Sequence, residues 1–226
     1  GTNSDGVSDA LERNIISGNS DAGITASFGV SQVMIAGNII GLNPEGTLAR
    51  ANSYGIHISD SSQITIGTND DGVGDVLEGN IISGNTNAGI LFDGSNCTLN
   101  TAAGNNIGTN SSGSLAFPNQ FGIIITNGAH HNLIGNDGDE TDTGEERNLI
   151  SGNQIGLGID GGATSHNIVA GNWIGIDNTG VTGLPNDFGI FIDSAPNNLV
   201  GTNGDGAGDA QERNIISGNT KQGVYI

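Results

Sequence analysis

Short aliphatic runs recur along the chain at fixed positions, each preceded by Asn and followed by Gly and Asn. The phrase Arg13-Asn14-Ile15-Ile16-Ser17-Gly18-Asn19 returns with few changes at residues 79–85, 147–153 and 213–219. Its first Asn therefore recurs every 66 to 68 residues. A period this regular, in a chain with 40 Gly residues, predicts a solenoid of stacked repeats.

Each repeat contains two coils. A Gly followed by an aliphatic residue recurs every 32 to 34 residues, at 23–24, 55–56, 89–90, 122–123, 156–157, 189–190 and 223–224. A companion row has alternating spacings of about 24 and about 42 residues, and consists of Asn14, Asn38, Asn80, Asn105, Asn148, Asn172 and Asn214. Plain coils of about 24 residues therefore alternate with coils of about 42 residues that carry extra loops.

Within each coil, aliphatic and polar residues alternate with the period of two that a half-buried strand requires. Ile56 and Ile58 share one face, and His57 lies on the other. In the Asn-x-Ile phrase the third position is Ile in every coil and is predicted to face the core. The second position changes to Asn106 and Trp173, so it is predicted to lie at least partly outside.

Three short strands in each coil, joined by Gly-Asn turns, predict an all-β right-handed parallel β-helix of about 6.5 coils. The Gly content and the missing helical periodicity exclude long helices. Residues 1–226 are expected to form a single domain built from two-coil repeats of about 67 residues. Because the pattern shows no polar cap at either end, we expect a segment of a longer array, or a subunit that associates end to end.

Two of the Asn rows are predicted to form ladders of stacked side-chain amides, because Asn tolerates the backbone of tight corners and recurs once per coil. The first predicted ladder is the companion row given above. The second predicted ladder consists of Asn19, Asn43, Asn85, Asn110, Asn153, Asp177 and Asn219.

The charge balance excludes several partners. The chain has five Lys and Arg against 24 Asp and Glu, a formal charge of −19. Nucleic acids and anionic membrane surfaces need clustered basic residues, so neither is expected to bind. No apolar run is long enough for insertion of this segment into a membrane. The single cysteine, Cys97, is predicted to be a buried apolar residue.

Four acidic loops, residues 1–12, 67–78, 135–146 and 201–212, hold 16 of the 24 acidic residues. Carboxylate and amide oxygens in one tight loop suit calcium, which takes six to eight oxygen ligands, and we predict calcium as the cofactor. The candidate ligands are Asn3, Asp5, Asp9 and Glu12; Asn69, Asp71, Asp75 and Glu78; Asp137, Asp139 and Asp142; and Asn203, Asp205, Asp209 and Glu212.

A second interpretation needs no metal. Asp9 followed by Glu12 is the spacing of a capping box at the start of a short helical turn, and Arg13, Arg147 and Arg213 are placed to pair with the loop carboxylates. The phrase Asp71-Gly72-Val73-Gly74-Asp75 resembles the calcium loops of EF-hand, dockerin and thrombospondin-type repeats. It departs from the EF-hand pattern because the candidate Glu is tenth rather than twelfth in the loop.

The repeat resembles those of right-handed parallel β-helix proteins that are secreted or carried on bacterial surfaces, a group that includes pectate lyases, pectinases and phage tailspikes. The resemblance covers the whole chain but is architectural. It implies an extracellular or bacterial cell-surface location and a connection with glycans, and it implies no chemistry.

No catalytic residue is proposed from the sequence, because basic residues and carboxylates repeat rather than gather at one coil. We expect a non-enzymatic structural solenoid: a stalk, fibre, filament or adhesin segment. The alternative is a carbohydrate-active β-helix that binds or cleaves polysaccharide, as a lyase or a glycoside hydrolase. Candidates for stacking on glycans are Tyr54, Phe117, Phe121, Trp173, Phe188 and Phe191. His131 and His166 are expected at one shared turn, as polar corner residues or as metal ligands.

Overall fold

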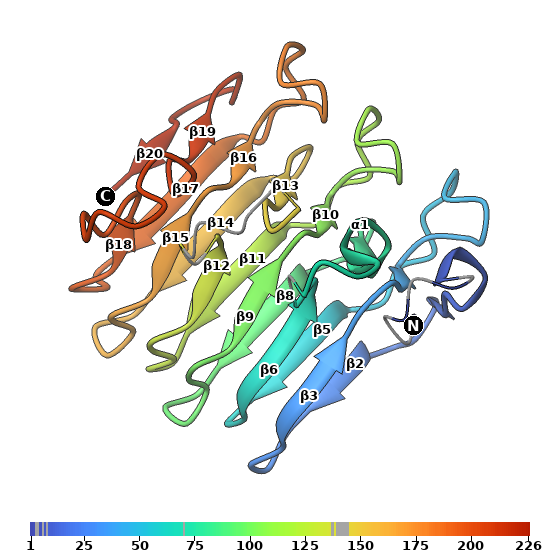
Figure 1. Ribbon diagram of the computed structural model, residues 1–226, viewed down its shortest axis with the longest axis horizontal. Helices are drawn as coiled ribbons and strands as arrows, with labels where there is room; N and C mark the ends of the chain where they lie inside the picture. Colours follow the sequence, from blue (N-terminus) through green and yellow to red (C-terminus); the bar gives the residue numbers. More distant parts are fainter. Residues whose placement is uncertain (3–4, 6, 8, 70, 137, 139–144) are drawn as a thin grey trace.

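The computed structural model describes residues 1–2, 5, 7, 9–69, 71–136, 138 and 145–226. The chain winds into a right-handed parallel β-helix of about six turns, with the N- and C-termini towards opposite ends of the rod (Figure 1). Every strand pairs in parallel with the strand one coil away, so the predicted fold is confirmed.

Three sheets run along the rod. Sheet A contains β1 (Ile15–Ile16), β4 (Ile39–Ile40), β7 (Ile81–Ile82), β10 (Asn106–Ile107), β13 (Leu149–Ile150), β16 (Trp173–Ile174) and β19 (Ile215–Ile216). Sheet B contains β2 (Ala22–Ala26), β5 (Tyr54–Ser59), β8 (Ala88–Asp93), β11 (Phe121–Thr126), β14 (Ile155–Asp160), β17 (Phe188–Asp193) and β20 (Val224–Tyr225). Sheet C contains β3 (Ser31–Ile35), β6 (Ser62–Gly67), β9 (Thr101–Ala103), β12 (Leu133–Gly135), β15 (Ile168–Ala170) and β18 (Leu199–Val200).

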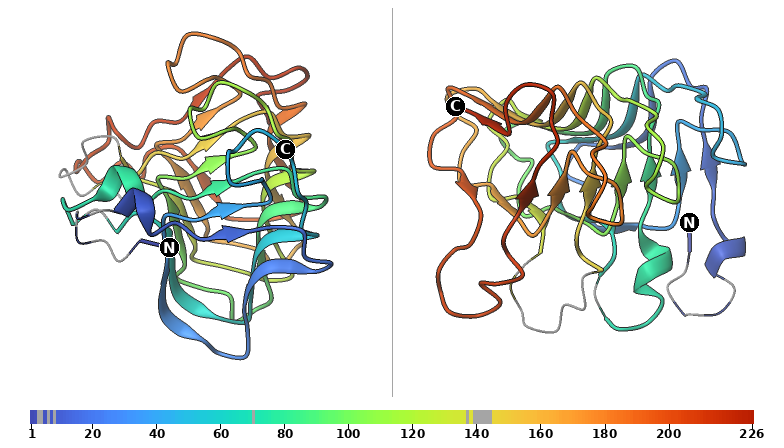
Figure 2. Two further views of the ribbon diagram at one scale, coloured as in Figure 1. Left: turned by 90° about the vertical axis from the view of Figure 1, so that its right-hand side faces the viewer. Right: turned by 90° about the horizontal axis from the view of Figure 1, so that it is seen from above.

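The extra residues of the longer coils project from both sides of sheet A. One set of loops joins sheet A to sheet B and forms a row along the rod, and the acidic loops at 67–78 and 201–212 join sheet C to sheet A (Figures 1 and 2). Among the described residues, helix is confined to α1 (Asp75–Glu78) and a 3-10 turn (Asp9–Leu11), each in an acidic loop. Within the described residues, no helix has the length and apolar character needed to cross a membrane.

The core is a column of aliphatic side chains inside the rod. The third residue of the Asn-x-Ile phrase stacks coil on coil, with Ile40, Ile82 and Ile107 in register and fully buried. Ile56 and Ile58 of β5 also point inward, and His57 points outward, as predicted. Each fully buried Ile contributes about 1.5–3 kcal/mol of transfer free energy. The core therefore grows with every coil added.

In the middle of the rod, the outward-facing side chains of sheet A are shielded from solvent. Ile39 and Ile81 lie outside the core column, yet they are 8% and 3% exposed. They pack with Leu42 and Phe117, which belong to the loops between sheets A and B. These loops therefore shield the outer face of sheet A, which explains how apolar residues are accommodated there.

The first predicted Asn ladder is confirmed at each step. The Nδ2 of each Asn donates to the Oδ1 of the next, at 2.9–3.1 Å, from Asn14 through Asn38, Asn80, Asn105, Asn148 and Asn172 to Asn214. Each inner amide also bonds to the backbone: Asn80 Nδ2 donates to the Ile35 carbonyl at 2.7 Å, and Asn80 N–H donates to Asn105 Oδ1. These buried amides are thus satisfied, which burial requires.

The second predicted ladder is wrong in its alternate members. The observed ladder runs through Asn19, Asn52, Asn85, Asn119, Asn153, Asn186 and Asn219. The predicted members Asn43, Asn110 and Asp177 stand at the loop entrances instead. There Asn110 Oδ1 accepts hydrogen bonds from the N–H groups of Ser114 and Leu115, which folds the loop locally.

A third ladder was not predicted. It runs along the inner side of sheet C through Asn100, Asn132, Asn167 and Asn198, with amide-to-amide distances of 2.9–3.0 Å. Each of these Asn residues directly precedes a strand, and that phrase could have revealed the row. Earlier coils hide it, because Ile64 occupies the ladder position and its N–H donates to Asn100 Oδ1.

Replacing Asn119 by Ala should destabilise the protein by about 2–4 kcal/mol, because the amide partners on Asn85 and Asn153 lose their bonds in a buried place. The matched variant Asn110→Ala removes two bonds at an exposed loop and should cost about 1 kcal/mol or less. Urea unfolding midpoints measure both. Equal losses of stability in the two variants would contradict the expectation that a buried ladder residue stabilises the protein more than an exposed loop residue does.

Candidate functional site

The acidic loops are attached to the rod through the backbone of their last Glu. Its carbonyl accepts a hydrogen bond from a Gly N–H at the end of the preceding coil; the pairs are Gly37–Glu78 (2.6 Å), Gly104–Glu146 (2.7 Å) and Gly171–Glu212 (2.7 Å). Gly104 has a φ of 71°, and a Cβ there would lie 2.7 Å from the Glu145 carbonyl oxygen. Glycine is therefore required at this contact.

Carboxylates fold the second acidic loop from within. Glu78 Oε2 accepts the Asn69 N–H at 3.0 Å, Asp71 Oδ1 accepts the Val73 N–H at 2.9 Å, and Asp75 Oδ2 accepts the Gly72 N–H at 3.0 Å. The fourth loop repeats these bonds with Glu212 to Asn203 (3.0 Å), Asp205 to Ala207 (2.8 Å) and Asp209 to Gly206 (3.4 Å). The predicted ligands therefore share one loop conformation.

Two carboxylate groups in these loops are buried although one or both of their oxygen atoms form no hydrogen bond. Glu78 is fully buried, and its Oε1 has no hydrogen-bond partner. Asp9 is 1% exposed, and neither of its carboxylate oxygens has a partner. Leaving charged oxygens buried and unpaired is costly. Nevertheless, no group of three or more His, Cys, Asp or Glu side chains among the described residues has an arrangement that could hold a metal ion.

The remaining predicted ligands fall into two groups. Asp5 lies in the first loop, where its Oδ1 accepts the Val7 N–H, and Glu12 lies at the end of the same loop. Asn3, Asp137, Asp139 and Asp142 lie outside the described residues.

The alternative interpretation as capped helical turns is half right. Short helical turns do form at Asp9–Leu11 and Asp75–Glu78. However, the N-cap of α1 is Gly74, in the left-handed region with a φ of 81° and no side-chain cap. Because the Asp9 oxygens also lack hydrogen bonds, the capping box that the spacing suggested does not form.

Two basic residues from different coils meet at one cleft, whereas the repeat pattern predicted that basic residues do not gather. Arg13 and Arg147 line a cleft of about 380 Å³ together with Asp75 and Glu145. At the intervening repeat position the chain has Gly79, which also lines the cleft. Burial lowers the pKa of Arg13. The replacement of Arg by Gly79 was the sequence signal that this stretch differs from the other repeats.

Arg147 has a structural contact at this cleft. Its guanidinium lies 3.9 Å from the centre of the Trp173 ring, a cation–π contact on the outer face of sheet A. One face of the Trp173 ring is therefore covered by an arginine.

A second hollow lies on the outer face of sheet B. It has a volume of about 360 Å³, and Tyr54 and Phe121 stand on either side of Ala88 in the strand register. Leu91 and Ile124 also line it. Because Ala88 is small, the two aromatic side chains flank an open slot.

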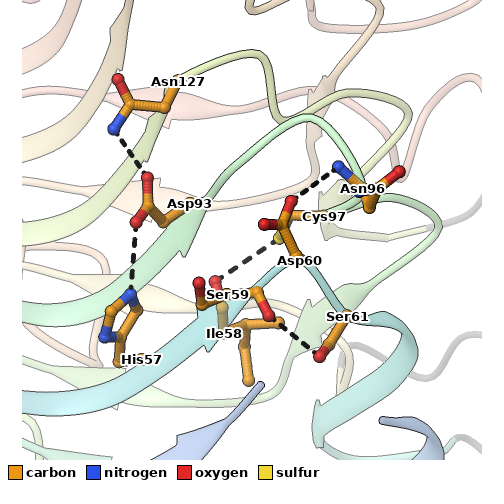
Figure 3. A network of polar contacts seen from close by, with 9 residues as sticks. All are labelled: His57, Ile58, Ser59, Asp60, Ser61, Asp93, Asn96, Cys97 and Asn127. Carbon is orange, nitrogen blue, oxygen red and sulfur yellow. Dashed lines mark hydrogen bonds and ion pairs between the residues drawn. The ribbon is translucent and has the colours of Figure 1, made fainter. Parts of the chain in front are cut away.

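One rim of this slot is polar. Asp93 receives a hydrogen bond from Asn127 Nδ2 to its Oδ1 at 2.7 Å, and its Oδ2 lies 3.5 Å from His57 Nε2 (Figure 3). Asn87 and Gln120 also line the slot. The slot thus combines aromatic walls with hydrogen-bonding groups and carries no basic side chain other than His57.

The aromatic surface continues towards the C-terminal coils. Phe191 and Tyr225 are stacked with ring centres 4.9 Å apart, and Phe188 meets both edge-on. Of the six predicted stacking residues, Tyr54, Phe121, Phe188 and Phe191 share this face. Phe117 instead belongs to a loop between sheets A and B and packs against Ile39 and Ile81 on the outer face of sheet A.

His131 and His166 occupy a separate corner, between sheets B and C. His131 and His166 have φ values of 53° and 58°, and Gln63 and Asn197 have matching values of 55° and 56° in other coils. The prediction that these residues share one turn is confirmed. Only residues that tolerate the left-handed region are suited to this column.

Cys97 is fully buried beside these elements. Its Sγ lies 3.6 Å from the Ile58 carbonyl, while the Asp60 side chain accepts the N–H of the preceding residue, Asn96 (Figure 3). Burial raises the pKa of the Cys97 thiol to about 12. The prediction of a buried cysteine is therefore confirmed.

Comparison of the chain with protein-family models, with curated proteins and with solved structures found no match.

Cys97 should not react with iodoacetamide at pH 8 in the native protein, because the raised pKa leaves almost no thiolate and burial blocks access. In denaturant the thiol should be alkylated completely, as mass spectrometry can measure. Rapid alkylation under native conditions would contradict the burial of this side chain.

Proposed function

We propose that this chain is a segment of an extracellular structural rod, such as a stalk, fibre, filament or adhesin of a bacterial surface. The observation that carries the proposal is the continuity of the sheets and Asn ladders from the first coil to the last. A rod whose units are repeated along its axis suits a mechanical role, whereas catalysis requires a centre where the repeat is broken.

The proposed cofactor is calcium, bound at the acidic loops. The buried oxygens of Asp9 and Glu78 that lack hydrogen bonds support it, because a cation would compensate them. So does the concentration of carboxylates at one edge of a chain with a charge of −19. Calcium accepts carboxylate, amide and backbone oxygens in flexible geometry, so small movements within a loop would complete each site.

Millimolar calcium should raise the melting temperature by several degrees relative to excess chelator, since a site filled at 100 times its Kd adds about 2.7 kcal/mol. Glu78→Gln should lower the calcium stoichiometry measured by titration calorimetry by one. The control Asp21→Asn, at an exposed residue outside the acidic loops, should leave it unchanged. Identical melting curves with calcium and chelator would refute this part of the proposal.

End-to-end contact is proposed as the way the rod extends. Val33 in the first coil is 38% exposed, whereas its register partner in the next coil, Ile64, is fully buried. At the other end Val224 and Tyr225 are 41% and 46% exposed. We infer that a further coil covers these surfaces, either from additional repeats of the same chain or from a second copy.

Glycan binding is the second candidate function, and the slot on sheet B favours it. Aromatic side chains offer apolar faces to sugar rings, and Asp93, Asn87 and Gln120 supply hydrogen-bonding groups at the rim. The chain charge of −19 favours a neutral glycan over an acidic one. Under this proposal the rod presents the slot, and no turnover is implied.

Tyr54→Ala and Phe121→Ala should each reduce binding to a neutral polysaccharide about tenfold, measured by affinity electrophoresis over a panel. Alanine already occupies the equivalent position of a neighbouring coil, since Ala22 pairs with Tyr54 and Ala88 pairs with Phe121. The fold should therefore persist in both variants. Phe28→Asn, at a 98% exposed aromatic away from the slot, is the control. Binding that survives both slot variants would exclude this site.

An assay for reducing ends and unsaturated products over the same panel tests the structural proposal separately. The expected result is no turnover. Reproducible product formation would overturn the non-enzymatic role, whatever the outcome of the calcium and binding experiments.

A further inference from the structure

The two aromatic side chains of the slot on sheet B recur with the period of the repeat. Tyr54 and Phe121 are 67 residues apart, and both pair in register with Ala88 on the strand between them. The strands β5, β8 and β11 follow one another along the rod (Figure 1). The Cα atoms of the two aromatic residues are therefore two strand spacings apart along the rod, about 9.6 Å.

The ring of Phe121 lies over the outer face of the sheet. Gly158 occupies an outward position of the next strand, in register with Ile124 and Phe191, and it is nevertheless buried. A Cβ at Gly158 would lie 3.2 Å from Cδ1 and 3.3 Å from Cε1 of Phe121. The aromatic ring therefore covers this glycine, and the side of the half-buried ring that faces away from the sheet is left for a ligand.

Polar groups flank the two rings on both sides of the slot. Asn87 and Gln120 directly precede β8 and β11, and Asp93 and Asn127 lie at the other ends of the same strands; all four line the slot. His57 Nε2, which is 3.5 Å from Asp93 Oδ2, is buried and forms no hydrogen bond. Hydroxyl groups that project from the edges of a sugar ring would therefore meet hydrogen-bonding groups on both sides.

An extended polysaccharide fits this arrangement. In an extended β-1,4-linked chain successive pyranose rings are turned over, so every second sugar presents the same face. Each sugar advances such a chain by roughly one strand spacing, so two sugars span the distance between the aromatic rings. Among the described residues His57 is the only basic side chain that lines the slot, and the charge of −19 favours a neutral sugar over a uronic acid.

We propose that the slot binds a linear, neutral, β-1,4-linked polysaccharide that lies along the rod, with alternate sugars stacked on Tyr54 and Phe121. This inference rests on the glycan-binding function proposed above, and it adds the linkage, the direction and the register of the ligand. A trisaccharide is the shortest ligand that reaches both rings, through its first and third sugars. An α-1,4-linked chain coils instead, so its sugars do not present one face at this spacing.

Phe188 continues the same column but is already covered. It lies 67 residues beyond Phe121, and Lys221 Nζ is 4.8 Å from the centre of its ring. Phe191 and Tyr225 meet the Phe188 ring edge-on. Phe188 is therefore not part of the proposed site. Phe188→Ala is a matched control, because it makes the same change at the equivalent position of another coil.

Titration calorimetry with cellobiose, cellotriose and maltotriose tests the proposal. Cellotriose should bind about tenfold more tightly than cellobiose, because the third sugar adds a second stacking contact. Maltotriose, which is α-1,4-linked, should bind no more tightly than cellobiose. Tyr54→Ala and Phe121→Ala should each remove the difference between cellotriose and cellobiose, and Phe188→Ala should retain it. Circular dichroism melting checks that the three variants are folded.

Equal affinities for cellobiose and cellotriose would overturn this inference, as would a preference for maltotriose. If polysaccharide binding still depended on Tyr54 and Phe121 in that case, the glycan-binding function itself would stand. If no neutral polysaccharide bound the protein, both the inference and that function would fail. Self-association that is lost in Tyr54→Ala and Phe121→Ala, without binding of cellotriose, would reassign this face to contact between rods and overturn the proposal.

Discussion

The buried asparagine amide is the constraint on which this structure depends. Each inner ladder residue, such as Asn105, uses its Nδ2 and Oδ1 atoms for bonds to the coils on both sides and to the backbone. Those bonds form only when successive corners lie one strand spacing apart, about 4.8 Å. Coils can therefore differ in length, but they cannot differ in the position of their corners without leaving buried amides unpaired.

This constraint determines where extra residues can be accommodated. The loops of the longer coils leave the rod just before or just after a corner, and both sets flank sheet A. Apolar residues of the loops between sheets A and B, including Leu42 and Phe117, pack over its outer face. Among the described residues, the connections from sheet B to sheet C are short, so the outward residues of sheet B form the more accessible face. The division between a shielded sheet and an open one follows from the position of the insertions and not from the strands themselves.

The sequence was sufficient for the architecture because its strongest signals are those the fold repeats: the inward Ile and the first row of Asn. The prediction of the second ladder chose Asn43 where Asn52 is the true member, because both positions are Asn. Distance along the chain favoured Asn43, but a loop separates it from the corner where Asn52 stacks. The third ladder was missed because Ile64 replaces Asn in an early coil.

The candidate sites show a related limit, since their members are distant in sequence and share only a column along the rod. Arg13 and Arg147 meet at one cleft, as do Tyr54 and Phe121 at the slot on sheet B. A corner accepts Gln63, Leu99 or His131 with almost the same φ, so its chemistry can vary without disturbing the fold. Local chemistry then depends on which residues neighbouring coils place in the same column. For this reason the chemical properties of a solenoid are better inferred from the residues at equivalent positions of successive coils than from residues adjacent in sequence, once the ladder has established which residues are aligned.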